Sequence, residues 1–222
     1  MNPDDSGFID AGSIHETQAG ETPINEDDRE FLLPAFGHIQ SRDEQNRAEA
    51  ENIALGLEWL DDQGDLDPGR LLSQWFLREL HREMFGQVWS WAGKPLTRET
   101  TIGIDPAYIT ERWEQLLGDA RFWIDQQTYS PDEICVRLHH RQVAIHPFVN
   151  GNGRHARITA NKLAEVLGLS KPGRDRFTWG FSPEAPDRET VRREYLNALV
   201  QADRGDYSLL VEIALRPRPS AL

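Results

Sequence analysis

The sequence has one cysteine, a shortage of basic residues and no long apolar run. Cys135 has no second cysteine with which to form an internal disulfide, which favours a reducing, cytoplasmic environment. The 222 residues include 24 Lys and Arg against 37 Asp and Glu, a formal net charge of −13. Such acidity argues against binding to nucleic-acid phosphates or anionic membranes. A membrane span needs about 18 consecutive apolar residues, so we expect neither a span nor a signal peptide.

The composition predicts one globular domain preceded by an arm. Hydrophobic residues make up 38% and charged residues 27% of the chain, in the range of soluble domains with a full core. Residues 1–30 are acidic and lack periodic apolar positions, so we expect a flexible N-terminal arm. Residues 31–216 would form the domain and 217–222 a short C-terminal tail. The segment from Phe31 to Pro34 is expected to dock the arm onto the domain.

Apolar residues spaced three and four apart predict an all-α fold. We expect helices over about 43–60, from Pro68 to Gly86, and over 106–126, 131–146, 152–168, 187–203 and 206–215. Asp105 and Ser130 are each followed by proline, the pattern of a helix N-cap with Pro in the first turn. Residues 94–104 alternate weakly and predict a short hairpin. The tryptophans are expected to pack in the core: Trp59, Trp75, Trp89, Trp91, Trp113, Trp123 and Trp179.

A glycine-punctuated turn between two predicted helices is typical of an anion cradle. Gly151 and Gly153 allow a positive φ and leave no side chain between the backbone amides and a bound anion. The next helix is expected to begin near Asn152, so its unpaired N–H groups and positive dipole end would face the turn. This arrangement favours binding of a phosphate-containing group.

The turn is flanked by charged and titratable side chains that suit phosphate chemistry. Arg154, Arg157 and Asn161 are three and four residues apart, on one face of the predicted helix. Two guanidinium groups placed together can grip a polyphosphate. His146 stands at the end of the preceding helix, where a neutral imidazole could take a proton from an incoming hydroxyl. The pattern indicates transfer of a phosphate-containing group to a hydroxyl.

The segment from His146 to Arg157 reads His-Pro-Phe-Val-Asn-Gly-Asn-Gly-Arg-His-Ala-Arg. It resembles the signature of the Fic/Fido (Doc) family, His-x-Phe-x-acid-Gly-Asn-Gly-Arg-x-x-Arg, and departs from it only at Asn150. The resemblance extends over about residues 45–213 and takes in a flap at 94–104. The chain looks closest to the bacterial subgroup called mobile mystery protein B. The resemblance implies a Fic-type helical bundle with one small β-hairpin flap.

The family resemblance implies a protein adenylyltransferase, which transfers AMP from ATP to a Ser, Thr or Tyr hydroxyl of a target protein. His146 would be the base, and Arg154 a catalytic group that also holds the β-phosphate. Arg157 would hold the γ-phosphate. The amides that would hold the α- and β-phosphates belong to Gly151, Asn152 and Gly153.

The same resemblance assigns a metal ligand and a docking segment. Asn150 stands where the family has a carboxylate that binds Mg²⁺, and its neutral amide oxygen is a weaker ligand for that ion. The flap would pair with the target by strand addition. Its docking residues would be Thr101, Ile102, Gly103 and Ile104.

Other donors and other roles stay open. Family members that transfer UMP, phosphate or phosphocholine use the same scaffold, and loss of the acid at Asn150 is compatible with an inert nucleotide-binding or partner-binding module.

Glu51 and Glu212 each match part of a family motif whose glutamate blocks the γ-phosphate arginine. Inhibition by a helix-turn-helix, antitoxin-like partner is the arrangement implied by the subgroup, and it would make the protein a toxin. The histidines beside His146 lack the Cys or carboxylate spacing of a zinc site, so no such site is predicted.

Overall fold

The computed structural model describes residues 30–39, 42–100, 102–180 and 188–217, so most of the predicted arm and tail lies outside the described residues. The described part is mostly helical and contains no β-sheet, which confirms the all-α prediction. Leu32 and Trp89 form an isolated antiparallel bridge. The elements are η4 (Pro34–Phe36), α1 (Arg42–Asp61), α2 (Pro68–Leu71), α3 (Gln74–Phe85), α4 (Pro106–Gln126), α5 (Pro131–Ile145), α6 (Asn152–Val166), α7 (Arg188–Asp203) and α8 (Ser208–Leu215).

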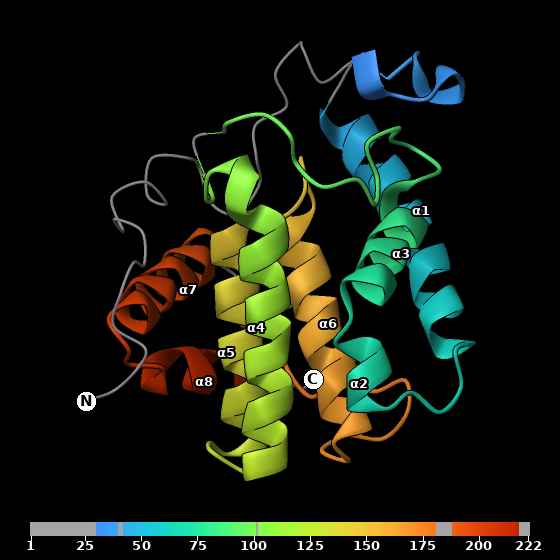
Figure 1. Ribbon diagram of the computed structural model, residues 1–222. Helices are drawn as coiled ribbons and strands as arrows, with labels where there is room; N and C mark the ends of the chain where they lie inside the picture. The colour runs from blue at the N-terminus through green and yellow to red at the C-terminus, as the bar shows by residue number, and fades with distance from the viewer. Residues whose placement is uncertain (1–29, 40–41, 101, 181–187, 218–222) are drawn as a thin grey trace, which may run out of the picture.

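Helices α4, α5 and α6 run side by side through the centre of the molecule (Figure 1). Helices α1 and α3 pack together on one side of this bundle, and α7 and α8 lie on the other. The predicted caps fix two helix starts: the Asp105 carboxylate accepts the Ala107 N–H at 2.8 Å, and the Ser130 hydroxyl accepts the Glu133 N–H at 3.3 Å. Because α5 and α6 are joined by a short turn, residues 146–151 stand at one end of the bundle.

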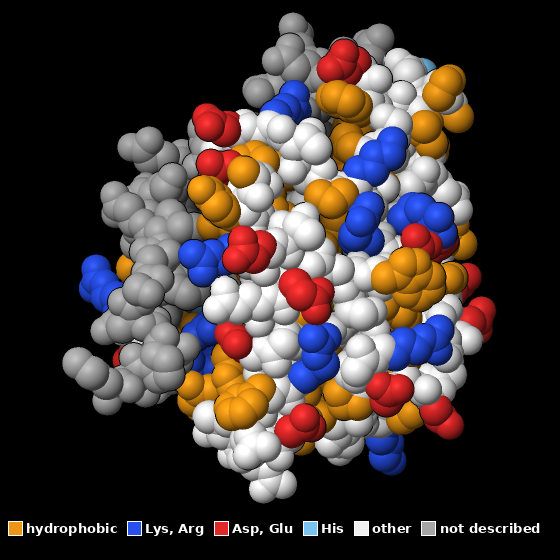
Figure 2. Space-filling model, viewed as in Figure 1, with side chains coloured by type: hydrophobic (Ala, Val, Ile, Leu, Met, Phe, Trp, Pro, Cys, Tyr) orange, Lys and Arg blue, Asp and Glu red, His pale blue; other side chains and the backbone are white. Residues whose placement is uncertain are grey.

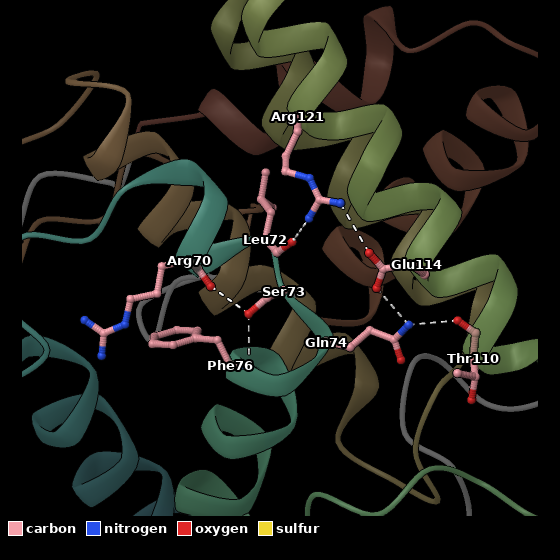
Figure 3. A network of polar contacts seen from close by, with 8 residues as sticks. All are labelled: Arg70, Leu72, Ser73, Gln74, Phe76, Thr110, Glu114 and Arg121. Carbon is pink, nitrogen blue, oxygen red and sulfur yellow. Dashed lines mark hydrogen bonds and ion pairs between the residues drawn. The ribbon is translucent and has the colours of Figure 1, made fainter.

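The helix predicted from Pro68 to Gly86 is two helices, because polar groups interrupt it at Leu72 (Figure 3). Arg121 of α4 donates to the Leu72 carbonyl, and the Ser73 hydroxyl accepts the Phe76 N–H at 3.3 Å, capping α3. The Gln74 amide then donates to the Thr110 carbonyl at 2.8 Å. Partners on a distant helix therefore replace the local hydrogen bonds of a continuous helix and fasten the start of α3 to α4.

Helix α1 forms as predicted, and the face that it buries is largely polar. Leu57 is 40% exposed, whereas Leu60 is buried together with the polar residues Gln45, Glu49 and Asn52. The Asn52 side chain donates to the Glu83 carbonyl at 2.8 Å and accepts the Gln87 N–H at 2.9 Å. Hydrogen bonds from neighbouring elements offset the cost of burying Asn52 and Glu49.

The hairpin predicted at 94–104 is not formed by the described residues of that segment, and Thr101 lies outside them. The backbone bonds elsewhere: the Leu96 N–H donates to the Pro147 carbonyl at 2.8 Å, and the Ile104 N–H lies 3.5 Å from the Ile145 carbonyl oxygen. The segment is irregular because it is held against the turn at 145–147 and not against itself.

Most of the tryptophans are core residues as predicted, and Trp113 and Trp89 are almost fully buried. Trp75 contradicts the prediction, since 65% of it is exposed on α3. The expected docking of the segment that begins at Phe31 is found, with the Leu33 N–H donating to the Val88 carbonyl at 2.9 Å. Among the described helices, none is both long and apolar enough to cross a membrane.

Candidate active site

The candidate site is built on the turn that joins α5 to α6. His146 ends α5 in a left-handed conformation, with φ 57° and ψ 59°, and its N–H donates to the Gln142 carbonyl at 3.2 Å. Gly151 precedes α6 with φ 79°, and no side chain caps that helix start. The turn therefore brings the end of one helix next to the amide-rich beginning of the next, as the sequence predicted.

Asn152 and Phe148 lock this turn from inside. The Asn152 side chain accepts the Phe148 N–H at 3.0 Å and donates to the Phe148 carbonyl at 2.8 Å. The Phe148 ring is fully buried and stacks on His81 with 3.6 Å between ring centroids. The Asn152 side chain thus stabilises the loop, while its backbone N–H belongs to the first turn of α6.

His81 fastens the turn to the segment beside it. Its Nδ1 accepts the Gly93 N–H at 3.0 Å, so the neutral ring carries its proton on Nε2 and donates to the Asn150 carbonyl at 3.0 Å. Burial lowers the pKa of His81 well below its usual value, which keeps the ring neutral. The site loop is therefore held in place by a buried group outside the motif.

His146 is neutral and almost enclosed. It is 7% exposed, and burial lowers its pKa to about 4, an effect that a hydrogen bond with the Val143 backbone partly opposes. A Cβ atom added at Gly103 would lie only 2.5 Å from the His146 Cβ, so the backbone of Ile102–Ile104 passes directly against this histidine. The structure thus brings together the predicted base and the described part of the predicted docking segment.

Arg154 lies at the start of α6 but is engaged by another group. Its guanidinium lies 2.6 Å from the Glu49 carboxylate of α1 and 4.9 Å from the centre of the Phe85 ring. The Arg154 side chain is 30% exposed, whereas that of Glu49 is 2% exposed. The anion that Arg154 binds in this structure is therefore a carboxylate of the same chain.

Sequence reasoning missed Glu49. Its carboxylate also accepts the Trp89 indole N–H at 2.9 Å and the Gln45 amide N–H at 3.0 Å. The available signal was the spacing of Gln45 and Glu49, which places both on one face of a helix. Glu51 and Glu212, the glutamates singled out from motif matches, are both exposed.

Arg157 lies on the same helix and contacts a second buried group that sequence reasoning missed. It hydrogen-bonds to the hydroxyl of Tyr195 in α7, which lies 2.7 Å from Nε2 of His139. Burial raises the pKa of Tyr195, and the Arg157 charge and hydrogen bond oppose the rise. Burial and then the Arg157 charge lower the pKa of His139, so this ring is neutral. Helix α7 thus helps to hold Arg157.

The other polar residues near the motif have structural partners. His155 lies 2.8 Å from both the Gln142 amide and the Leu77 carbonyl oxygen. Asn161, on the helix face predicted to bear the arginines, accepts the Phe177 N–H at 2.8 Å and fixes the loop after α6. The Asn150 side-chain oxygen accepts the Gly151 N–H at 2.7 Å. Within the described ranges, no three His, Cys, Asp or Glu residues form a metal-binding group.

The turn leaves no room for a side chain at Gly151. We expect Gly151→Ala to lower the free energy of unfolding by about 1–2 kcal/mol through its positive φ and by about 1–3 kcal/mol more through contact with Phe85. The added Cβ would lie 2.6 Å from two atoms of that ring. Gly168→Ala is a matched control, because Gly168 has φ +76° and no atom within 4 Å of such a Cβ. Urea denaturation that shows equal losses for the two variants would contradict the close packing.

The buried neutral histidines make stability depend on pH. Burial lowers the pKa of His146 and of His155 to about 4, below the value of about 6.5 expected in the unfolded chain. Their contribution is therefore complete above pH about 6.5 and is lost as the pH falls towards 4. One pKa unit corresponds to about 1.4 kcal/mol, so we expect a loss of a few kcal/mol for each histidine. Urea denaturation of wild type and His155→Gln at about pH 7, 6 and 5 measures this slope, which should be smaller in the variant.

Comparison with known proteins supports the family resemblance. The model of the Fic/DOC family matches residues 71–164. Protein adenylyltransferase fic-1 of Caenorhabditis briggsae is 32% identical over 136 residues, which are 58% of this chain and 24% of that protein. The chain spans about a quarter of the length of the curated relatives that it matches.

Solved structures show the same fold. A segment of Fic-1 from Caenorhabditis elegans aligns with a TM-score of 0.56 at 25% identity, covering 84% of this chain and 50% of that one. The BepC protein of Bartonella tribocorum, solved with bound AMPPNP, aligns with a TM-score of 0.59 at 14% identity, covering 88% of this chain and 100% of that one. The match to the Fic/DOC family model over residues 71–164 thus lies within a fold that solved Fic structures share.

Proposed function

We propose that this protein is a Fic-type protein adenylyltransferase that transfers AMP from ATP to a Ser, Thr or Tyr hydroxyl of another protein. The observation that carries the proposal is the position of neutral His146 beside the start of α6, the helix that bears Arg154 and Arg157. Relatives named protein adenylyltransferases support it over the matched region. The bound AMPPNP of a protein with the same fold supports ATP as the donor.

In the proposed reaction, the target hydroxyl oxygen attacks the α-phosphorus of ATP. His146 accepts the hydroxyl proton, the new oxygen–phosphorus bond forms, and the bond to the bridging oxygen of the β-phosphate breaks so that pyrophosphate leaves. The backbone amides of Asn152 and Gly153, and that of Gly151 once it leaves the Asn150 side chain, would hold the α- and β-phosphates at the positive end of α6. Arg154 and Arg157 would hold the β- and γ-phosphates.

The segment Ile102–Ile104 would align the target. Because its backbone lies against His146, a target strand paired with it would bring a hydroxyl close to the imidazole. Backbone hydrogen bonds between strands depend little on side-chain identity. The register of the target strand against this segment would therefore determine which hydroxyl is modified. Thr101 would take part in the same pairing.

We propose Mg²⁺ as a companion of the nucleotide and not as a resident of the protein. The one neutral oxygen offered by Asn150 already accepts the Gly151 N–H, and a hard cation prefers several charged oxygen ligands. These residues therefore do not form a magnesium site without the triphosphate. No step of the proposed transfer is assigned to the metal.

Labelled donors test the function. Purified protein incubated in bacterial lysate with Mg²⁺ and ATP labelled at the α-phosphate should label target proteins, whereas ATP labelled at the γ-phosphate should not. GTP, CTP and UTP labelled at the α-phosphate show whether another base is preferred. Labelling from the γ-phosphate alone would overturn adenylylation in favour of phosphate transfer.

The second candidate function is a nucleotide-binding or partner-binding module with little catalysis, and it rests on Asn150 and on the engagement of Arg154 by Glu49. Asn150→Asp restores a carboxylate to the turn. An inert wild type that binds ATP, together with an active Asn150→Asp variant, would favour this second function. Labelling by both proteins favours the first.

We further propose a cytoplasmic, toxin-like role for residues 31–216 with an antitoxin-like helix-turn-helix partner, as in the mobile mystery protein B subgroup. Cys135 is a free thiol, and a chain with a single cysteine is in keeping with a reducing compartment. Expression of the chain alone in bacteria should slow growth, and His146→Ala should restore it. Unrestrained growth with the wild-type chain would count against toxicity.

A further inference from the structure

A surface cleft of about 400 Å³ runs along α3, and its lining residues lie outside the motif at 146–157. One wall is a face of α3, formed by Trp75, Arg78, Glu79 and Arg82, and the other is the turn Ala92–Lys94. We call this cleft the α3 groove. Figure 2 shows hydrophobic and basic side chains side by side over this part of the molecule.

The exposed aromatic in the α3 groove stands on a rigid base. Trp75 is 65% exposed although the residues on either side of it are fixed: Gln74 bonds to α4, and Phe76 is fully buried (Figure 3). A large apolar ring held in solvent by a rigid helix contributes little to the stability of the fold. Tryptophan and arginine are the residues most enriched at the centres of protein interfaces.

The charge of the α3 groove selects an acidic occupant. The lining carries three cations and one carboxylate in a chain whose formal net charge is −13. Arg78 is held by its Nε, which donates to the Gly93 carbonyl at 3.0 Å, and its guanidinium faces the cleft. Arg82 is already paired with Glu79 and Glu83, so Arg78 and the exposed Lys94 supply the positive charge that remains for an occupant. A cationic cleft on an acidic protein attracts carboxylates and repels basic segments.

The turn at the edge of the α3 groove is continuous with the candidate active site. From Lys94 the chain runs to Leu96, whose N–H donates to the Pro147 carbonyl at 2.8 Å, and on to Gly103, which lies against His146. Beneath the turn, His81 joins Gly93 to Asn150. A peptide lying in the groove would therefore contact the beginning of the segment 94–104, and the other end of that segment lies against His146.

We propose that the α3 groove binds an acidic segment of the protein target, outside the modified region, with Trp75 packing against an apolar side chain and Arg78 and Lys94 facing the carboxylates. This inference rests on the proposed function for the identity of the partner. The binding event itself requires neither nucleotide nor transfer.

A peptide-binding measurement tests the groove. The probe is a short fluorescein-labelled peptide rich in Glu with one central Leu, and its binding is followed by fluorescence anisotropy without nucleotide. We expect Trp75→Ala and Lys94→Glu each to weaken binding at least tenfold, equivalent to about 1.4 kcal/mol. Lys171→Glu removes an exposed cation of the loop after α6 and should leave the affinity unchanged. A Lys-rich peptide of the same length should not bind.

Four outcomes would overturn the proposal. They are no binding of the Glu-rich peptide, equal weakening by Lys171→Glu, a dimer that Trp75→Ala dissociates, and binding that appears only after deletion of residues 1–29. The third would assign the groove to a second copy of the chain, and the fourth to its own acidic N-terminus. Thermal denaturation should show Trp75→Ala to be as stable as wild type. Because the assay contains no ATP, failure here leaves adenylylation untouched, and failure of labelling leaves peptide binding measurable.

Discussion

Replacing His146 by alanine is expected to lower the rate of AMP transfer by about 100- to 10,000-fold, the usual contribution of a positioned general base. The physical reason is that His146 is neutral, with a pKa of about 4, and lies against the backbone of the segment proposed to align the target. The measurement is the initial rate of protein labelling from ATP labelled at the α-phosphate.

Two further variants separate the base from the backbone that carries it. His146→Asn suits the left-handed conformation at this position, with φ 57°, and should be as inactive as the alanine variant. His38→Ala changes an exposed histidine outside the motif and should keep the wild-type rate. Full labelling by His146→Asn would show that this imidazole is not the base.

Glu49→Gln is expected to tighten ATP binding about tenfold, which corresponds to about 1.4 kcal/mol. The Glu49 carboxylate lies 2.6 Å from the Arg154 guanidinium and so competes with phosphate for the same cation. Glutamine keeps the size of the side chain and can still accept the Trp89 indole N–H while it removes the charge. Isothermal titration calorimetry with ATP measures the dissociation constant.

The matched control for this prediction is Glu51→Gln, which makes the same change at an exposed position of α1. The expected result for Glu51→Gln is wild-type affinity. Weaker ATP binding by Glu49→Gln would mean that the carboxylate orients Arg154 for the nucleotide and does not block it. The Glu49→Gln protein should also be less stable, because the half-buried Arg154 guanidinium loses its charged partner.

Helix boundaries and the motif loop could be predicted because their causes are local. Asp105 and Ser130 cap the helices that follow them within three residues, and Gly151 permits the left-handed turn before α6. In these cases the sequence neighbourhood contains nearly all of the interacting partners.

The rest could not be predicted because the partners are distant in sequence. Glu49 is buried because Trp89 and Arg154 lie beside it after folding, and nothing near position 49 indicates either contact. The break before α3 depends on Arg121 of α4, which supplies the hydrogen bond that the Leu72 carbonyl would otherwise make within a helix. Apolar periodicity reports which residues avoid water and not which polar residues find partners.

The segment 94–104 was also predicted wrongly because its hydrogen-bond partners are distant in sequence. Weak alternation in 94–104 predicted a hairpin, but the Leu96 N–H is taken by the Pro147 carbonyl. Tyr195, which contacts Arg157, belongs to a helix that carries no recognisable motif. The motif therefore identified the chemistry of the site, while the groups that hold its two arginines came from α1 and α7.

Mass spectrometry of lysate proteins after incubation with the purified chain, ATP and Mg²⁺ tests adenylylation most directly. The expected result is a Ser, Thr or Tyr residue that carries one AMP, present with the wild-type chain and absent with His146→Asn. Phosphate alone on the hydroxyl, or an AMP adduct of equal abundance with His146→Asn, would contradict His146-dependent transfer of AMP.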